Sequence, residues 1–314
     1  MSLAQARANA LQLAFNADTV STPRHLGIQL HEPTIEELTP YIDWTPFFQT
    51  WDLHGKYPQI LSDAIVGEAA TKVFEDAQQL LAQLTQDRTI VCKGLSGIFA
   101  ANAIGDDIEI YDADTKEILH KQITLRQQTK KVAGQPNLAL ADFIAPKDTQ
   151  IQDYIGAFVV TAGLGIDRYI AEYEASNDDY NSIMVKALAD RLAEAFAEYL
   201  HEVVRKETWG YAADETLENQ ALIAEKYRGI RPAPGYPACP DHLEKLGIFK
   251  LLDATAQIGV TLTESLAMWP AASVSGWYFA HPDAKYFGLG KMTQEQLEDV
   301  AQRKGENAVD IERW

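Results

Sequence analysis

The sequence is poor in basic residues and contains no long apolar run. Its 314 residues include 27 Lys and Arg against 45 Asp and Glu, which gives a formal net charge of −18. Nucleic acids bind to positively charged surfaces, so this balance argues against a nucleic-acid partner. No apolar stretch approaches the roughly 20 residues that cross a bilayer, and no secretory signal opens the chain. We therefore expect no membrane partner and a cytoplasmic location.

Residues that bind metals are also few. The two cysteines, Cys92 and Cys239, lie far apart, and the seven histidines are scattered along the chain. This excludes a disulfide framework and a four-thiolate metal site, and the H-E-x-x-H zinc motif is missing. We predict that the chain provides no metal ligands.

The glycine motifs of common nucleotide-binding and hydrolase folds are missing as well. Gly163-Leu-Gly165 lacks the third glycine of G-x-G-x-x-G, and neither G-x-x-x-x-G-K-[ST] nor G-x-S-x-G occurs. The doubly wound nucleotide-binding sheet and the α/β-hydrolase fold are therefore unsupported.

Apolar periodicity predicts two long helices, over residues 63–86 and 179–206. The β-prone runs are joined by connections too short for parallel crossovers, so most strands are predicted to be antiparallel. Because no linker rich in Pro, Gly or Ser divides the chain, the pattern indicates one α+β domain. The expected strands cover residues 90–92, 98–99, 108–111, 119–125, 155–161, 263–268 and 273–279, with 286–289 as a segment that pairs with the last.

The remaining segments give weaker patterns. Residues 1–62 are irregular and rich in aromatic rings, which usually anchor a core or a pocket. Short helices are predicted near residues 218–228 and from residue 240. A last helix over 294–304 begins with a capping box and is followed by a glycine.

The segment over residues 229–287 carries most of the chemistry. Four prolines within about ten residues hold its start extended, and Gly235 permits a close approach to the backbone. Arg231 offers a planar fork that matches a carboxylate, and Tyr236 offers a flat apolar face with a polar tip. These residues suit a small zwitterionic ligand with an aromatic ring. A rigid loop packed on a core is the alternative, and spacing alone leaves both open.

Several motifs here resemble the C-terminal activation domain of cobalamin-dependent methionine synthase. The S-adenosylmethionine (AdoMet) motif of that family, R-x-x-x-G-Y, is met by Arg231, Gly235 and Tyr236. On this resemblance the chain divides into an N-terminal linker or extension, residues 1–24, and an AdoMet-binding activation domain, residues 25–314. Further stretches that look like the family cover residues 41–48, 105–111, 179–190, 262–270, 273–279 and 281–286.

The resemblance implies a twisted antiparallel sheet flanked by long helices, with AdoMet in a shallow groove. Arg231 would pair with the AdoMet carboxylate and Asp43 would accept from its ammonium group. Tyr286 would supply a hydroxyl group or a ring face near the sulfonium. The alternatives are that Asp43 caps a helix and that Tyr286 is a core ring. The cofactor-binding residues expected from the family motifs are Asp43, Arg231, Ala233, Gly235, Tyr236, Tyr286 and Phe287.

One of these positions departs from the family pattern. Phe287 stands where the family usually has Tyr, so only a ring or backbone contact carries over. The resemblance assigns no catalytic acid or base, because the domain positions a methyl group for transfer.

The function implied by the resemblance is reactivation of methionine synthase. In this family AdoMet remethylates a cobalamin that has become oxidised, with an electron from flavodoxin or a flavin reductase. Cobalamin is expected on a partner domain and zinc only in the full enzyme, because this chain has neither a D-x-H-x-x-G segment nor a cysteine cluster. The isolated chain should therefore not make methionine. Its end at residues 311–314 favours a piece excised from a longer enzyme.

Two functions from other classes stay open. One is an independent AdoMet-dependent methyltransferase, against which the missing glycine-rich strand–loop–helix argues. The other is a non-catalytic docking module for a flavodoxin-type partner, against which the intact motif residues argue.

Two charged features allow two interpretations each. Asp190 and Glu194 lie one turn apart on a polar helix face, which is either solvated or placed to orient the sulfonium of AdoMet. The stretch from Lys121 to Lys131 holds four basic residues and no acid. It is either a solvated strand end or a docking patch for an acidic redox partner.

Overall fold

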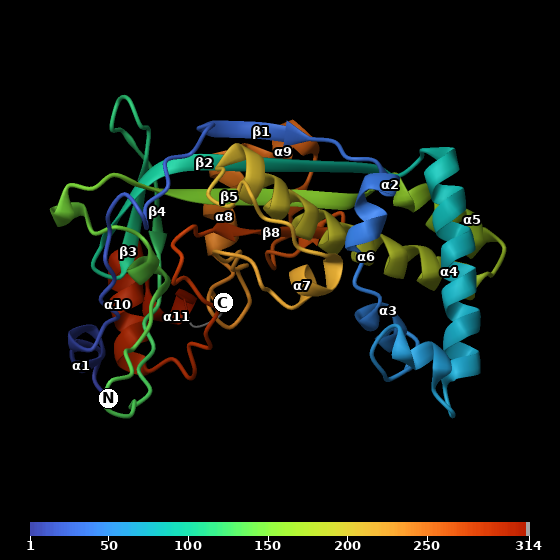
Figure 1. Ribbon diagram of the computed structural model, residues 1–314, viewed down its shortest axis with the longest axis horizontal. Coiled ribbons are helices and arrows are strands. Elements are labelled where there is room, and N and C mark those ends of the chain that lie inside the picture. The colour runs from blue at the N-terminus through green and yellow to red at the C-terminus, as the bar shows by residue number, and fades with distance from the viewer. Residues whose placement is uncertain (312–314) are drawn as a thin grey trace.

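The computed structural model describes residues 1–311, in which six strands form one large antiparallel sheet (Figure 1). The strand order is β4-β3-β2-β5-β8, and β1 pairs with β2 on the edge that β3 also uses. This confirms the predicted α+β class with its antiparallel sheet. The strands are β1 (Gly27–His31), β2 (Val91–Ile104), β3 (Asp107–Tyr111), β4 (Ile118–Ile123), β5 (Asp153–Leu164) and β8 (Ser273–Tyr278), while β6 (Thr261–Leu262) and β7 (Met268–Trp269) pair apart from them.

The long strands β2 and β5 form the centre of the sheet. The sequence predicted two short runs, 90–92 and 98–99, where β2 is one strand, and that prediction is wrong. Small residues interrupt the apolar pattern of β2 because helices approach there. A Cβ on Gly94 would crowd Phe196 on one face, and a Cβ on Gly97 would crowd Leu252 on the other.

Each face of the sheet has its own hydrophobic core, because successive side chains of a strand point to opposite faces. From β5, Phe158 and Val160 join one core, together with Leu192 and Phe196 of α6 (Asp179–Val203). Ile155 and Val159 join the other core, together with Leu252 of α8 (Glu244–Leu252). Because both faces are covered, β5 is buried along nearly its whole length.

The helices are divided between the two faces of the sheet. The long helix α6 crosses one face of the sheet, with α4 (Gly67–Asp87) and α5 (Ile166–Ala175) beside it at one end (Figure 1). Asp178 begins α6, since its carboxylate accepts a hydrogen bond from the backbone N–H of Asn181. On the other face lie α8 and α9 (Ala254–Ile258). The remaining α-helices are α1 (Leu3–Ala8), α2 (Ile35–Leu38), α3 (Thr45–Gln49), α7 (Asn219–Ile223), α10 (Gln294–Lys304) and α11 (Ala308–Ile311).

Several predicted elements differ from the observed ones. The segment 286–289 is coil, and its Leu289 N–H bonds to the carbonyl of Pro237 rather than to β8. The helix expected from residue 240 begins at Glu244, after the Asp241 carboxylate caps the N–H of Leu243. The expected strand 263–268 is mostly the turn between β6 and β7.

The predicted helices are better placed than the strands, although their ends shift. The helix expected over 218–228 is limited to α7, and the one expected over 179–206 ends at Val203, before a π-helical turn over Val204–Thr208. Only half of the capping box expected for the last helix forms. Thr293 accepts from the N–H of Gln296, but the Gln296 side chain bonds to the backbone of Arg126 rather than to the N–H of Thr293.

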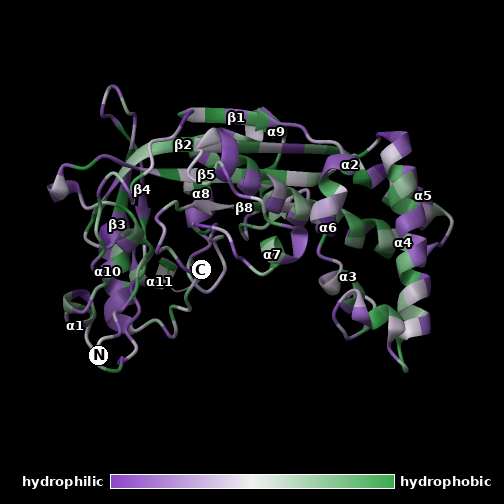
Figure 2. Cartoon of the chain, in the orientation of Figure 1, coloured by the Kyte–Doolittle hydropathy of each residue, from purple (hydrophilic) through white to green (hydrophobic). Residues whose placement is uncertain are grey.

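Residues 1–24 lie against the body of the protein. Leu3 is buried, and Arg7 of α1 pairs with Asp106 at 2.7 Å and with Asp299 of α10 at 2.8 Å. α10 is strongly hydrophilic (Figure 2), and these ion pairs help to hold it in place. The expectation about the end of the chain rests largely on residues 312–314, which lie outside the described residues.

A buried arginine joins the same ion-pair cluster. Arg126 is 3% exposed, and its guanidinium lies 2.7 Å from carboxylate oxygens of both Asp106 and Asp142. Arg303 of α10 contacts Asp107 and the carbonyl of Thr124 close by. Over residues 1–311, no helix has the length and apolar character that a membrane span needs.

We expect Arg126→Ala to lower the free energy of unfolding by about 3–5 kcal/mol, because it leaves the buried Asp142 without its cation and the buried Asp106 with Arg7 alone. Urea unfolding followed by circular dichroism measures the change. Lys130→Ala removes an exposed positive charge from the same stretch and should leave the midpoint nearly unchanged. Equal midpoints for the two variants would contradict the stabilising role of Arg126.

Candidate functional site

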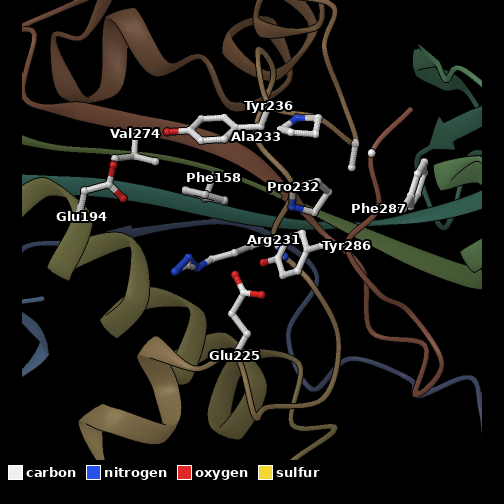
Figure 3. A pocket seen from close by; sticks show the side chains of 13 residues that line it. Phe158, Glu194, Glu225, Arg231, Pro232, Ala233, Tyr236, Val274, Tyr286 and Phe287 are labelled. Atoms are coloured by element: carbon white, nitrogen blue, oxygen red, sulfur yellow. The ribbon is translucent and has the colours of Figure 1, made fainter. Parts of the chain in front are cut away.

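A cavity of about 530 Å³ lies against the α6 face of the sheet, near strands β5 and β8. Phe158 of β5 and Val274 of β8 form an apolar part of its wall, and Glu194 of α6 also lines it (Figure 3). Two coil segments, 231–238 and 286–288, complete the wall together with Glu225. The R-x-x-x-G-Y motif and the Tyr286–Phe287 pair therefore come together at one cavity.

Asp43 lies in an adjoining cavity of about 320 Å³. The two cavities form one groove, because Glu194, Glu225 and Arg231 line both. Asp43 precedes α3, and one of its carboxylate oxygens accepts a hydrogen bond of 2.9 Å from the backbone N–H of Thr45. Trp44 rather than Asp43 stands at the N-cap of α3, so this bond is a local turn contact, and no group within residues 1–311 donates to the other Asp43 oxygen.

Backbone bonds to the edge of β8 hold the segment that carries Arg231. Ile230 and Phe279 exchange two backbone hydrogen bonds of 3.0 Å, and the carbonyl of Pro232 accepts from Trp277 at 3.0 Å. Pro232 has no N–H to leave unpaired, so it is suited to this one-sided pairing. The side chain of Arg231 is thereby directed away from the strand and into the groove (Figure 3).

The guanidinium of Arg231 is held by a buried acid. Its Nη2 lies 2.7 Å from Oε2 of Glu198, which is 5% exposed. Burial raises the pKa of the Glu198 carboxyl, although the neighbouring arginine charge opposes this shift. Nε of Arg231 and Oε1 of Glu198 are both buried without a hydrogen-bond partner. The pair therefore has unused hydrogen-bonding capacity at the groove.

Tyr286 connects the two coil segments. Its hydroxyl oxygen accepts a 3.0 Å hydrogen bond from the backbone N–H of Arg231 and lies 3.4 Å from the hydroxyl of Tyr227. Burial of the hydroxyl raises its pKa, so it stays protonated. The Tyr286 residue as a whole is 36% exposed, which excludes the core-ring alternative. Phe287 lines the same cavity and packs on Phe143, with 6.4 Å between the ring centroids.

Gly235 shapes the turn at the end of the motif. Its φ of 98° lies in the left-handed region, and its N–H bonds to the carbonyl of Cys239 at 2.8 Å. A Cβ at this position would overlap the His242 ring. Ala233 and Tyr236 on the near side of the turn both line the cavity, and Tyr236 is 60% exposed. Gly235 therefore sets the shape of the turn and does not itself line the cavity.

The structure separates the two acids that the sequence paired on α6. Glu194 lines both cavities, whereas Asp190, one turn earlier, is exposed and lines neither of them.

The structure accounts for two of the four charges in the basic stretch from Lys121 to Lys131. Lys121 pairs with Asp107 at 2.7 Å, and Arg126 is buried between Asp106 and Asp142. The acids that neutralise these two charges are distant in sequence. Lys130 and Lys131 are in no ion pair within residues 1–311, so a docking role for this stretch stays a prediction.

Two site residues were missed in the sequence. Glu198 belongs to the same polar face of α6 as Asp190 and Glu194, for which the sequence left a solvated role and a ligand-orienting role open. The arginine facing Glu198 makes it a buried partner. Glu225 follows α7 with a φ of 53°, at a helix-end position where Gly or Asn is usual. A charged residue at that helix-end position, six residues before Arg231, was the feature of the sequence that could have indicated Glu225 as a site residue. Within the described chain, no group of three His, Cys, Asp or Glu is arranged to hold a metal ion.

Fold and groove together define an α+β domain with an open groove of a size that suits a small ligand. Residues 34–305 match the family of vitamin B12 dependent methionine synthase activation domains, and the chain belongs to this family. A solved crystal structure of the MetH reactivation domain bound to AdoHcy (S-adenosylhomocysteine) is 54% identical, with a TM-score of 0.95. That match covers 100% of this chain and 97% of the other. The family resemblance found in the sequence is thereby confirmed.

We expect Gly235→Ala to lower the free energy of unfolding by about 1–3 kcal/mol for the backbone conformation alone, and further because of the overlap with His242. Gly134→Ala is the matched control, since Gly134 has a φ of 84° but open space around its Cβ position. Urea unfolding of both variants separates the two contributions. A control variant as destabilised as Gly235→Ala would show that the contact with His242 has no effect.

Proposed function

We propose that this chain is the module of methionine synthase that holds AdoMet for the reductive remethylation of oxidised cobalamin. The observation that carries this proposal is the Arg231 guanidinium, held by Glu198 at the wall of a groove that also contains Asp43. A reactivation domain of nearly identical fold, 54% identical to this chain, binds AdoHcy, which is AdoMet without its transferable methyl group.

The groove residues fit the amino-acid end of AdoMet. The Arg231 side chain is 20% exposed, and the guanidinium could donate a charge-assisted hydrogen bond to a ligand carboxylate. The second carboxylate oxygen of Asp43 would accept from the ligand ammonium group. The exposed ring of Tyr236 and the apolar Phe158 and Val274 offer contact area for the adenosine part.

The contribution of the protein is orientation. AdoMet, when bound, supplies a methyl group on a positively charged sulfonium. Arg231 and Asp43 would fix the two charged ends of the amino acid, and Tyr286 would fix the coil beside them. No side chain needs to take up or release a proton, so we assign no catalytic acid or base.

The partners belong to the same proposal. A cobalamin-binding domain of the same enzyme would receive the methyl group, with flavodoxin or a flavin reductase as electron donor. The chain alone would form part of a methyltransferase and would not make methionine, since zinc and cobalamin would be bound elsewhere in the full enzyme. We also propose a cytoplasmic location; Cys92 and Cys239 are both free and buried.

Isothermal titration with AdoMet tests the site directly. We expect Arg231→Ala to weaken AdoMet binding about 100-fold, because the ligand carboxylate loses its charged partner. Arg168→Ala, which removes an exposed arginine from α5, should leave the affinity unchanged. An unchanged affinity for Arg231→Ala, or no AdoMet binding by the unmodified chain, would overturn the proposal. The second result is what a non-catalytic docking module would give.

Glu198 should act through Arg231. We expect Glu198→Ala to weaken AdoMet binding about tenfold, because the guanidinium loses the acceptor that holds it. Glu198→Gln keeps an acceptor oxygen in place and should recover part of the loss in the same titration. If Gln and Ala were equally damaging, an acceptor at this position would not be what orients Arg231.

A further inference from the structure

Residues 14–21, which we call the strap, contact the coil that carries Arg231. Arg228 lies three residues before Arg231 in that coil and is half-buried. Its Nη2 donates to the carbonyl of Thr19 at 3.3 Å and to Oγ of Ser21 at 3.2 Å. A guanidinium stays protonated in proteins and carries five N–H donors, so a half-buried one needs acceptors. The strap supplies two of them.

The same guanidinium joins the strap to two further segments. Nε of Arg228 donates to the carbonyl of Ala280 at 2.9 Å, and Nη1 donates to the carbonyl of Tyr211 at 3.3 Å. Gly229, the next residue, has a φ of 82°, and a Cβ there would overlap the carbonyl oxygen of Phe279. Because this close approach leaves the coil little freedom, a shift of the guanidinium is passed along the coil to the groove.

His281 attaches the strap to the second coil, five residues before Tyr286. Its Nδ1 accepts from the N–H of Asp283 at 3.1 Å, so its Nε2 carries the proton and donates to the carbonyl of Ala14 at 3.3 Å. Burial lowers the pKa of His281, which keeps the ring in this neutral form. The ring of Phe15 meets the His281 ring edge to face, with 5.1 Å between the centroids. The strap therefore contacts both coils of the groove wall.

The strap is itself fixed to the body of the protein. Nε1 of Trp209 donates to the carbonyl of Ser21 at 2.8 Å. Just after the strap, the N–H of His25 donates to the carbonyl of Thr208 at 3.0 Å. Both anchors follow closely on α6, the helix that lines the groove. The strap therefore places the two coils relative to α6.

We propose that the strap is a positioning element of the AdoMet site, which holds the two coils in place through Arg228 and His281. No residue of the strap lines either cavity, so its effect on the ligand passes through these two side chains. Such coupling is reciprocal: if the strap contacts strengthen AdoMet binding, bound AdoMet strengthens the strap contacts by the same factor. This inference rests on the proposed function and adds to the site a part of the chain outside the groove.

Isothermal titration with AdoMet on the full 314-residue chain tests both sides of the contact. We expect Arg228→Ala to weaken binding about tenfold and Phe15→Ala about threefold. Arg228→Lys keeps a charged donor and should recover part of the loss. Arg24→Ala is the matched control and should leave the affinity unchanged. Arg24 is exposed just beyond the strap and donates to the carbonyl of Lys206 rather than to either coil.

Hydrogen exchange separates positioning from a general gain in stability. The amides of Val20 and His25, both in backbone hydrogen bonds, are followed with and without saturating AdoMet. We expect AdoMet to slow their exchange about tenfold in the unmodified chain, and much less in Arg228→Ala. The amide of Lys116, in the turn between β3 and β4, is the control and should exchange at the same rate in both conditions.

The outcomes distinguish this inference from the proposed function. If either Arg228→Ala or Phe15→Ala bound AdoMet as tightly as the unmodified chain, the inference would be wrong and the proposed function would stand. Strap amides that exchange equally fast with and without AdoMet would have the same meaning. A loss in Arg24→Ala as large as that in Arg228→Ala would also contradict a role of the specific contacts. Failure of the unmodified chain to bind AdoMet would overturn both.

Discussion

The ion pair between Arg231 and Glu198 is the interaction on which the groove depends. An arginine on a coil segment would normally extend into water, and a glutamate is rarely buried without a partner. Here each fixes the other, at 2.7 Å. The pair forms only because α6 lies close to the sheet, and α6 can lie there because Gly94 leaves room for Phe196. The absence of a side chain at Gly94 in β2 thus helps to determine where the guanidinium of Arg231 lies.

Two coil segments form part of the groove wall, and backbone hydrogen bonds hold both of them. The segment around Arg231 bonds to the edge of β8, and the carbonyl of Pro237 accepts the N–H of Leu289 from the second segment. The hydroxyl of Tyr286 joins the two coils through the N–H of Arg231. Coil allows the side chains of both segments to reach the cavity. The backbone bonds keep the cost of ordering them on ligand binding small.

The sequence was most informative where the interactions are local. Apolar periodicity located α4 and α6, and the motif residues Arg231, Tyr236 and Tyr286 all reach one groove. It was least informative where a partner is distant. Nothing near Glu198 indicates that an arginine will face it, and nothing near Lys121 and Arg126 indicates that acids will neutralise them. For the same reason β2 was predicted as two fragments. Its glycines make room for side chains of α6 and α8, which come later in the chain.

The contacts of Arg7 join the amino-terminal helix to two parts of the fold that are distant in sequence. Its guanidinium pairs with Asp106 beside β3 and with Asp299 on α10, some twenty residues before the backbone reaches β1. Before β1 the chain is held again, because the Trp209 side chain donates to the carbonyl of Ser21 and the N–H of His25 donates to the carbonyl of Thr208. Loss of the Arg7 pairs would therefore act on α1 and α10, while the chain that enters β1 keeps its own attachments.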